Sequence, residues 1–222
     1  MIEKTEKRII NLNLDGLCRS ALERVVSVEI SKDDEATVFI RDKDSSVRRK
    51  IIPFHPFIIL ENDSLLNGFN ESFEKIHLAR SEKNARTLRA IAKFAGVKSY
   101  DNALKYLKMK TGASPASLAS PYRIFNDLTQ QCLIMENIRL FRNMTFREIR
   151  RLQFDIETLT SEGYDFPNPE REDDKIAMIC LRDSAGWEKC INLNECADEK
   201  ELLEIFVRLI SERDPDVIEG YN

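Results

Sequence analysis

The stretch Leu152-Gln153-Phe154-Asp155-Ile156-Glu157-Thr158 alternates apolar and polar side chains, a pattern typical of a β-strand with one buried face. Successive side chains of a strand point to opposite faces, so Asp155 and Glu157 share one face while Phe154 and Ile156 point into a core. Two carboxylates this close repel each other unless a cation lies between them. With such a cation, Asp155 could bridge two divalent ions while Glu157 holds one, and such a pair of ions activates water and stabilises the leaving oxygen of a phosphodiester. Taken alone, however, a D-x-E pair in a strand is usually a solvated face.

The residues that follow this strand predict a complete α/β unit. A polar loop over 161–174 leads to a buried-type strand over 175–182, and a turn over 183–186 leads to a third strand over 187–193. Asp198 and Glu201 form a capping box for a helix. Its apolar face consists of Leu202, Ile205, Phe206, Leu209 and Ile210, and a last short strand covers 216–220. Three hairpin-linked strands and a helical crossover predict a mixed sheet in which the last strand is parallel to the first.

The residues before the strand predict a β-rich unit followed by helices. Its expected elements are strands over 25–30, 36–41, 54–60 and 73–79, and helices over 84–95, 100–110 and 121–131. The segment Ala113-Ser114-Pro115-Ala116-Ser117 has the composition of a linker. We therefore expect an α+β or α/β fold with one domain over 1–150 and a second over 151–222.

Charge changes sign close to this boundary. Residues 1–150 carry a net charge of +7 and residues 151–222 a net charge of −11. The pattern suits a first unit that contacts a polyanion and a second that gathers metal cations, although two solvated surfaces would give the same totals. The candidate basic groups for contact with DNA, with a structural role open for each, are Lys105, Lys108 and Lys110 beside Tyr106, the cluster Arg48-Arg49-Lys50, and Arg147, Arg150 and Arg151. The acidic loop Asp165–Asp174 would repel DNA, so it is expected to be a solvated insertion.

The five cysteines show no CxxC spacing, and the only histidines, His55 and His77, are far apart. A zinc site or a disulfide framework is not expected, and the cysteines are interpreted as buried free thiols. No apolar run approaches the length that spans a bilayer, and the N-terminus lacks the apolar core of a signal peptide. The expected location is the cytoplasm, without membrane contact.

Two sequence motifs resemble those of one enzyme family. Phe154-Asp155-Ile156-Glu157-Thr158 resembles the first exonuclease motif of family B DNA polymerases, and Asp214-Pro215-Asp216-Val217-Ile218-Glu219-Gly220-Tyr221-Asn222 resembles the lead into the second. The separation of the two and the capped helix between them also match. Phe54-His55-Pro56-Phe57 is similar to a segment of the polymerase N-terminal domain, so the resemblance covers essentially the whole chain.

The resemblance implies a polymerase-type N-terminal domain and the first part of an RNase H-like 3′→5′ exonuclease of the DEDD type, which proofreads DNA. Asp155 and Glu157 match its first two metal-binding carboxylates, for two Mg²⁺ or Mn²⁺ ions. Ile156, Thr158, Leu159 and Asn222 match positions that contact the single-stranded 3′ end or the terminal nucleotide. The other carboxylates, the catalytic Tyr and the polymerase motifs are absent from these 222 residues, so this chain is expected to be inactive alone.

Two other functions remain open. In one, the basic first unit acts as a non-catalytic single-stranded nucleic-acid-binding module, with the acidic unit as scaffold. A stand-alone DEDD exonuclease acting on RNA is the other alternative, and the N-terminal resemblance argues against it. For the family B polymerase interpretation, the expected partners are DNA, especially single-stranded 3′ ends, and the rest of a polymerase.

Overall fold

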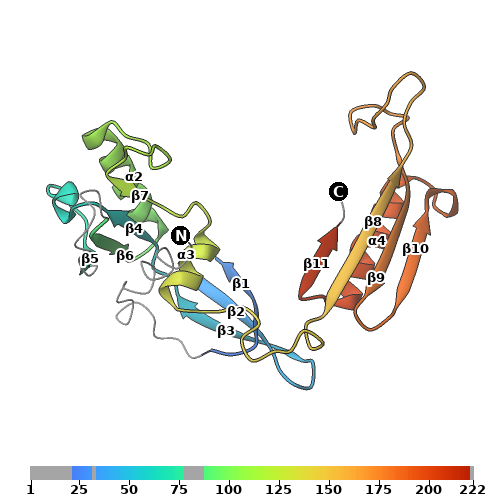
Figure 1. Cartoon of the computed structure of the whole chain (residues 1–222), viewed down its shortest axis with the longest axis horizontal. Helices are drawn as coiled ribbons and strands as arrows, with labels where there is room; N and C mark the ends of the chain where they lie inside the picture. The colour runs from blue at the N-terminus through green and yellow to red at the C-terminus, as the bar shows by residue number, and fades with distance from the viewer. Residues whose placement is uncertain (1–21, 32–33, 78–87, 221–222) are drawn as a thin grey trace, which may run out of the picture. The chain divides into compact units, whose positions relative to one another are not determined.

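The computed structural model describes residues 22–31, 34–77 and 88–220. The fold is mixed α+β and rich in β-structure, and the chain divides into two compact units between Arg142 and Asn143 (Figure 1). Each unit has a hydrophobic core of its own. No helix within the described residues is both long and apolar enough to cross a membrane.

The first unit contains two antiparallel sheets. One has the order β1-β2-β3 and the other the order β5-β6-β4-β7. Two α-helices and a short 3₁₀-helix complete this unit among its described residues. The bounds are β1 Val25–Ile30, β2 Glu35–Arg41, β3 Val47–Pro53, β4 Phe57–Leu60, η1 Asp63–Leu66, β5 Phe73–His77, β6 Ala90–Phe94, α2 Val97–Thr111, β7 Tyr122–Arg123 and α3 Leu128–Met135.

The predicted helix over 84–95 is wrong where the structure describes it. Ala90–Phe94 form β6, a central strand that pairs with β4 on one side and β5 on the other. Ala90, Ile91, Ala92 and Phe94 are all buried, and a short apolar run buried on both faces satisfies helical and strand periodicity equally well. Residues 84–87 of this prediction lie outside the described part of the chain.

Three further predictions for the first unit need correction. The basic cluster at 48–50 belongs to β3, an exposed strand that the prediction missed. Tyr122 and Arg123 form β7, and the helix predicted from 121 begins only at Leu128, where the Asp127 carboxylate caps it by accepting from the Thr129 amide. Ala113–Ser117 is no linker, because the Tyr122 hydroxyl donates to the Ala113 carbonyl at 2.7 Å within the first unit.

The second unit is the predicted mixed sheet. Its strands are β8 Arg151–Thr158, β9 Ile176–Asp183, β10 Glu188–Asn192 and β11 Val217–Gly220, in the order β10-β9-β8-β11, with η2 Leu193–Glu195 and α4 Glu199–Arg213 before β11. β8, β9 and β10 pair antiparallel, and β11 lies parallel to β8. The predicted N-cap is confirmed, since the Glu201 amide donates to Asp198, and the Glu201 carboxylate accepts from the amide of Ala197, one residue before the cap.

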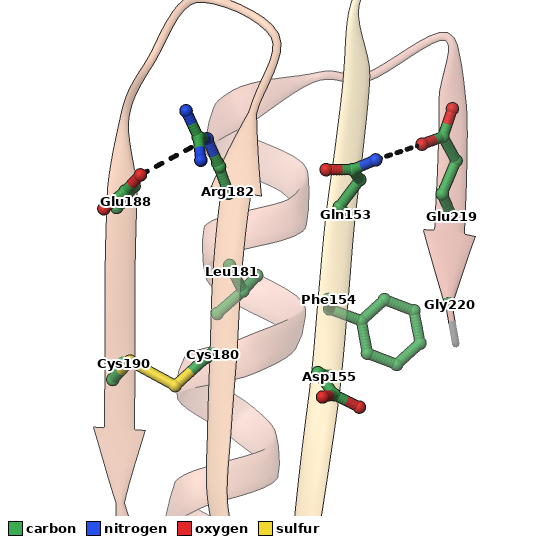
Figure 2. A pocket seen from close by; sticks show the side chains of 10 residues that line it. All are labelled: Gln153, Phe154, Asp155, Cys180, Leu181, Arg182, Glu188, Cys190, Glu219 and Gly220. Carbon is green, nitrogen blue, oxygen red and sulfur yellow. Dashed lines mark hydrogen bonds and ion pairs between the residues drawn. A yellow bond between two sulfur atoms is a disulfide. The ribbon is translucent and has the colours of Figure 1, made fainter. Parts of the chain in front are cut away.

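The core of the second unit lies between the sheet and α4. Leu152, Ile179, Leu181 and Ile191 from the strands pack with Leu202 of α4, and all five are buried. Helix α4 therefore covers one face of the sheet, and the opposite face carries polar side chains (Figure 2). This second face is the one on which Asp155 lies.

The prediction of free thiols is wrong for two cysteines. Cys180 of β9 and Cys190 of β10 are directly opposed in the antiparallel ladder and form a disulfide. Cys132 is a buried free thiol as expected, and burial raises its pKa to about 11. Cys196 is also a free thiol, half-buried, and Cys18 lies outside the described residues.

Candidate functional site

Asp155 and Glu157 lie on the face of β8 that α4 leaves open. Leu152 is buried in the core and Phe154 packs on Phe206 with ring centroids 5.2 Å apart, so alternation directs both carboxylates to the other side. Both acidic side chains are exposed. Asp155 is opposed by Cys180 across the ladder, and Glu157 by the next residue on that face of β9, Met178.

Ile156 does not point into a core as the strand pattern predicts. It pairs with Ile179 of β9, but 39% of its surface is exposed. In the part of the chain that the structure describes, the pairing of β11 ends at Gly220 opposite Phe154, so β8 has no neighbour on that side at Ile156. The side chain is therefore accessible, on the face of β8 opposite to the two carboxylates.

The other predicted contacts with substrate follow the carboxylates along the chain. Thr158 is exposed at the end of β8, after an irregularity in the β8–β9 ladder. Leu159 is 48% exposed, and its amide donates to the Lys175 carbonyl at 2.7 Å, which closes the base of the loop that follows. Asn222 lies outside the described residues.

The loop between β8 and β9 is an ordered structure built around Asp174. The Asp174 carboxylate accepts hydrogen bonds from the Ser161 amide at 2.6 Å, the Asn168 amide at 2.7 Å and the Arg171 Nε at 2.6 Å, and also from the Ser161 hydroxyl. Burial by itself would raise the pKa of this carboxyl, but these donors, with Ser161 and Arg171 foremost, hold it well below its ordinary value. The loop is therefore fixed from within.

This ordered loop presents aromatic side chains to solvent. Phe166 is 80% exposed and Tyr164 is 59% exposed. The Arg171 guanidinium lies 3.7 Å from the centre of the Tyr164 ring. Composition alone predicted a solvated acidic insertion. The missed signal is the pair of aromatics two residues apart, in a segment with few other apolar residues.

The side chains on the open face form a groove of about 490 Å³ (Figure 2). The Cys180–Cys190 disulfide lies next to Asp155 on the floor of the groove. Two residues further along the strands, four polar side chains lie side by side, namely Glu188, Arg182, Gln153 and Glu219. In that row Gln153 donates to Glu219 at 2.7 Å, and Arg182 pairs with Glu188 at 3.2 Å.

The open face carries two carboxylates whose chemistry suits a divalent metal ion. Asp155 and Glu157 offer oxygen ligands of the kind that Mg²⁺ and Mn²⁺ prefer. Within the described residues, no group of three or more histidine, cysteine, aspartate or glutamate side chains lies close enough together to hold a metal ion. The pair suits one side of such a site and does not complete it.

Several basic side chains proposed from the sequence have structural partners. Lys110 Nζ donates to the carbonyls of Leu65 and Asn67 and lies 5.3 Å from the centre of the Tyr106 ring, so it ties α2 to η1. Arg150 donates to the Arg213 carbonyl at 2.6 Å. Arg49 lies over Phe39, 5.4 Å from the ring centre, on an exposed part of the first sheet.

Comparisons with known proteins agree with this architecture. Residues 126–222 match the family described as "DNA polymerase family B, exonuclease domain". A DNA polymerase of Archaeoglobus fulgidus is 35% identical over 88 residues, which cover 40% of this chain and 10% of that protein. One from Desulfurococcus sp. (strain Tok) is 40% identical over 83 residues, 34% of this chain and 10% of that protein.

A solved structure extends the likeness of fold to most of the chain. It is the family B DNA polymerase from the hyperthermophilic archaeon Pyrobaculum calidifontis, with a TM-score of 0.58 and 18% identity, over 88% of this chain and 29% of that one. Residues 126–222 are therefore similar to the exonuclease region of family B DNA polymerases. The chain spans about a tenth of the length of the curated relatives it matches.

Proposed function

We propose that this chain is the N-terminal and exonuclease part of a family B-like DNA polymerase whose reaction is metal-dependent 3′→5′ hydrolysis of DNA. The observation that carries the proposal is the pair Asp155 and Glu157, exposed on one face of β8 within the matched exonuclease region. Asp155 and Glu157 would hold divalent ions, Mg²⁺ or Mn²⁺, which supply an activated water and neutralise the leaving oxygen. The substrate would be a single-stranded 3′ end of DNA. The protein would be located in the cytoplasm.

The residues around the pair would position the 3′-terminal nucleotide. Ile156 and Leu159 are exposed apolar residues next to the carboxylates in the sequence, with Ile156 on the opposite face of β8, and Thr158 offers a hydroxyl. Asn222, by resemblance, would contact the same strand. In the ordered loop, Phe166 and Tyr164 are exposed aromatic rings of the kind on which unpaired bases stack, and a loop fixed by Asp174 loses little entropy on binding.

Binding of Mn²⁺ to the 222-residue chain tests the proposed site. We expect weak binding, measured by the paramagnetic relaxation of water protons, because two carboxylates are a partial ligand set. Asp155→Asn and Glu157→Gln should each reduce it at least severalfold, whereas Glu172→Gln, an exposed acid of the loop, should leave it unchanged. Mn²⁺ binding that is indifferent to both site variants would overturn the assignment.

Hydrolysis by the isolated chain should be slight. A 3′-labelled oligonucleotide with Mg²⁺ or Mn²⁺ is expected to release few nucleotides, because the remaining carboxylates that the family resemblance implies are not among these residues. Robust release that Asp155→Ala abolishes would contradict this expectation and would mean that the pair is sufficient.

A second candidate function has one specific observation in its favour. On the sheet β1-β2-β3, the guanidinium of Arg49 lies over the ring of Phe39, and Ile51 of the same strand is 63% exposed. Arginine, aromatic and apolar groups on an open sheet suit contact with single-stranded nucleic acid without catalysis. Binding that Phe39→Ala and Arg49→Gln weaken, with Asp155→Asn neutral, would favour this function.

A further inference from the structure

The open face of the second sheet continues beyond Asp155 as a row of regularly spaced side chains. Along β8, Arg151, Gln153 and Asp155 occupy alternate positions and therefore share this face. Neighbours in the row are about 6.6 Å apart at the backbone, since a strand rises about 3.3 Å per residue. On β9, Arg182 lies directly opposite Gln153, so the row is two strands wide.

A second groove adjoins the one that contains Asp155. It has a volume of about 390 Å³ and shares Gln153 and Arg182 with the first. Arg151 and Ser184 lie at its far end, and the turn Ala185-Gly186 closes it. The two grooves thus form one continuous channel, with a carboxylate for metal at one end and arginines along the rest.

The acidic partners of the two arginines in this channel hold them only weakly. Arg182 is paired with Glu188 in an ion pair whose two side chains are 66% and 63% exposed, and such pairs contribute little free energy. Arg151 stacks on Phe146 at 3.9 Å and lies 3.7 Å from Glu219, beyond hydrogen-bond distance. Its Nε is buried without a hydrogen-bond partner in the described structure.

We propose that Arg182 and Arg151 form a phosphate track that holds the backbone of single-stranded DNA on the side of Asp155 away from the loop. The inference rests on the proposed exonuclease function and adds a path for the nucleotides that precede the terminal one. Guanidinium groups bind phosphate oxygens in a bidentate way, and stacking on Phe146 orients Arg151 for this contact. The row repeats at a spacing comparable with that of successive phosphates in an extended strand.

The acidic partners set the strength of this track. Glu188 and Glu219 compete with phosphate for the two guanidinium groups, so each phosphate contact must replace an existing ion pair. Removing an acidic partner should therefore strengthen binding, whereas removing an arginine should weaken it. A track that recognises only the backbone should also be insensitive to base sequence.

The test is binding of a fluorescent oligothymidylate to the full 222-residue chain, measured by anisotropy over a range of salt concentrations in EDTA. Each phosphate contact on a single strand contributes about −0.7 to the slope of log K against log salt. Arg182→Gln and Arg151→Gln are each expected to weaken binding severalfold and to make the slope shallower by about 0.7. Glu188→Gln is expected to tighten binding, because it releases Arg182.

Matched controls lie on α4, whose exposed ion pair Arg208–Glu212 has similar exposure. Arg208→Gln and Glu212→Gln change the net charge equally and should not alter the slope. If Arg182→Gln and Glu188→Gln behave like these controls, the phosphate track is wrong. Because the assay contains no metal, this failure is separable from that of the proposed function, which fails only if Mn²⁺ binding ignores Asp155 and Glu157.

Discussion

Asp174 shows how one carboxylate organises a segment that has no regular secondary structure. The loop between β8 and β9 contains two prolines and many acids, a composition that by itself predicts a solvated chain. Its order comes from donors at Ser161, Asn168 and Arg171 that converge on one buried carboxylate. The fixed position of Phe166 and Tyr164 in this loop therefore depends on the charge of Asp174.

Acid should release this loop. Since hydrogen bonds depress the folded-state pKa of Asp174 below its ordinary value, its contribution is complete at neutral pH and is lost as the pH falls below about 4 and through that depressed pKa. The Ser161 and Asn168 amide resonances in NMR spectra should titrate together over this acidic range. Resonances that shift between pH 7 and 5 would contradict this assignment.

Replacing Asp174 should have the same effect at neutral pH. Asp174→Asn removes the charge that holds the four donors, so limited proteolysis within residues 161–174 should become severalfold faster. The neighbouring exposed acid provides the control, and Asp173→Asn should leave the cleavage rate unchanged. Equal rates for parent and Asp174→Asn would show that other contacts order the loop.

At the scale of elements, the local sequence correctly predicted the features that depend on neighbouring residues alone. The alternation in β8 correctly placed Asp155 and Glu157 on one face, and the capping box correctly marked the start of α4. β6 was missed because its apolar run fits a helix equally well, and only its burial between β4 and β5 decides for a strand. Cross-strand register is not encoded locally, so the alignment of Arg182 with Gln153 was also not predictable.

The Cys180–Cys190 disulfide also depends on cross-strand register, here between β9 and β10. Its contribution to the stability of this hairpin can be tested. It closes a loop of 10 residues, which in the chain-entropy account stabilises the fold by about 2–3 kcal/mol. Dithiothreitol should lower the melting temperature of the parent, and Cys190→Ser should lower it equally without reductant. Cys196→Ser, which removes a free thiol, should retain the response to dithiothreitol. A parent that melts alike with and without reductant would contradict the stabilising role.

At the scale of the whole molecule, the two cores predict two separable unfolding reactions. Leu107 is buried in the core of the first unit and Leu202 in the core of the second, and each packs with residues of its own unit. Replacing a buried leucine by alanine lowers the free energy of unfolding by about 2–5 kcal/mol. Leu202→Ala should lower the stability of residues 143–222, which contain Asp155, and leave the first unit as it was.

Hydrogen exchange of the intact chain measures the two reactions separately, because each amide reports the opening of its own unit. Leu202→Ala should accelerate exchange in β8 and β9 and spare β4 and β6, and Leu107→Ala should do the reverse. The paired variants control for each other, since the same side chain is shortened in both. Exchange that accelerates throughout the chain in either variant would show a single cooperative structure, and Mn²⁺ binding at Asp155 would then depend on the first unit as well.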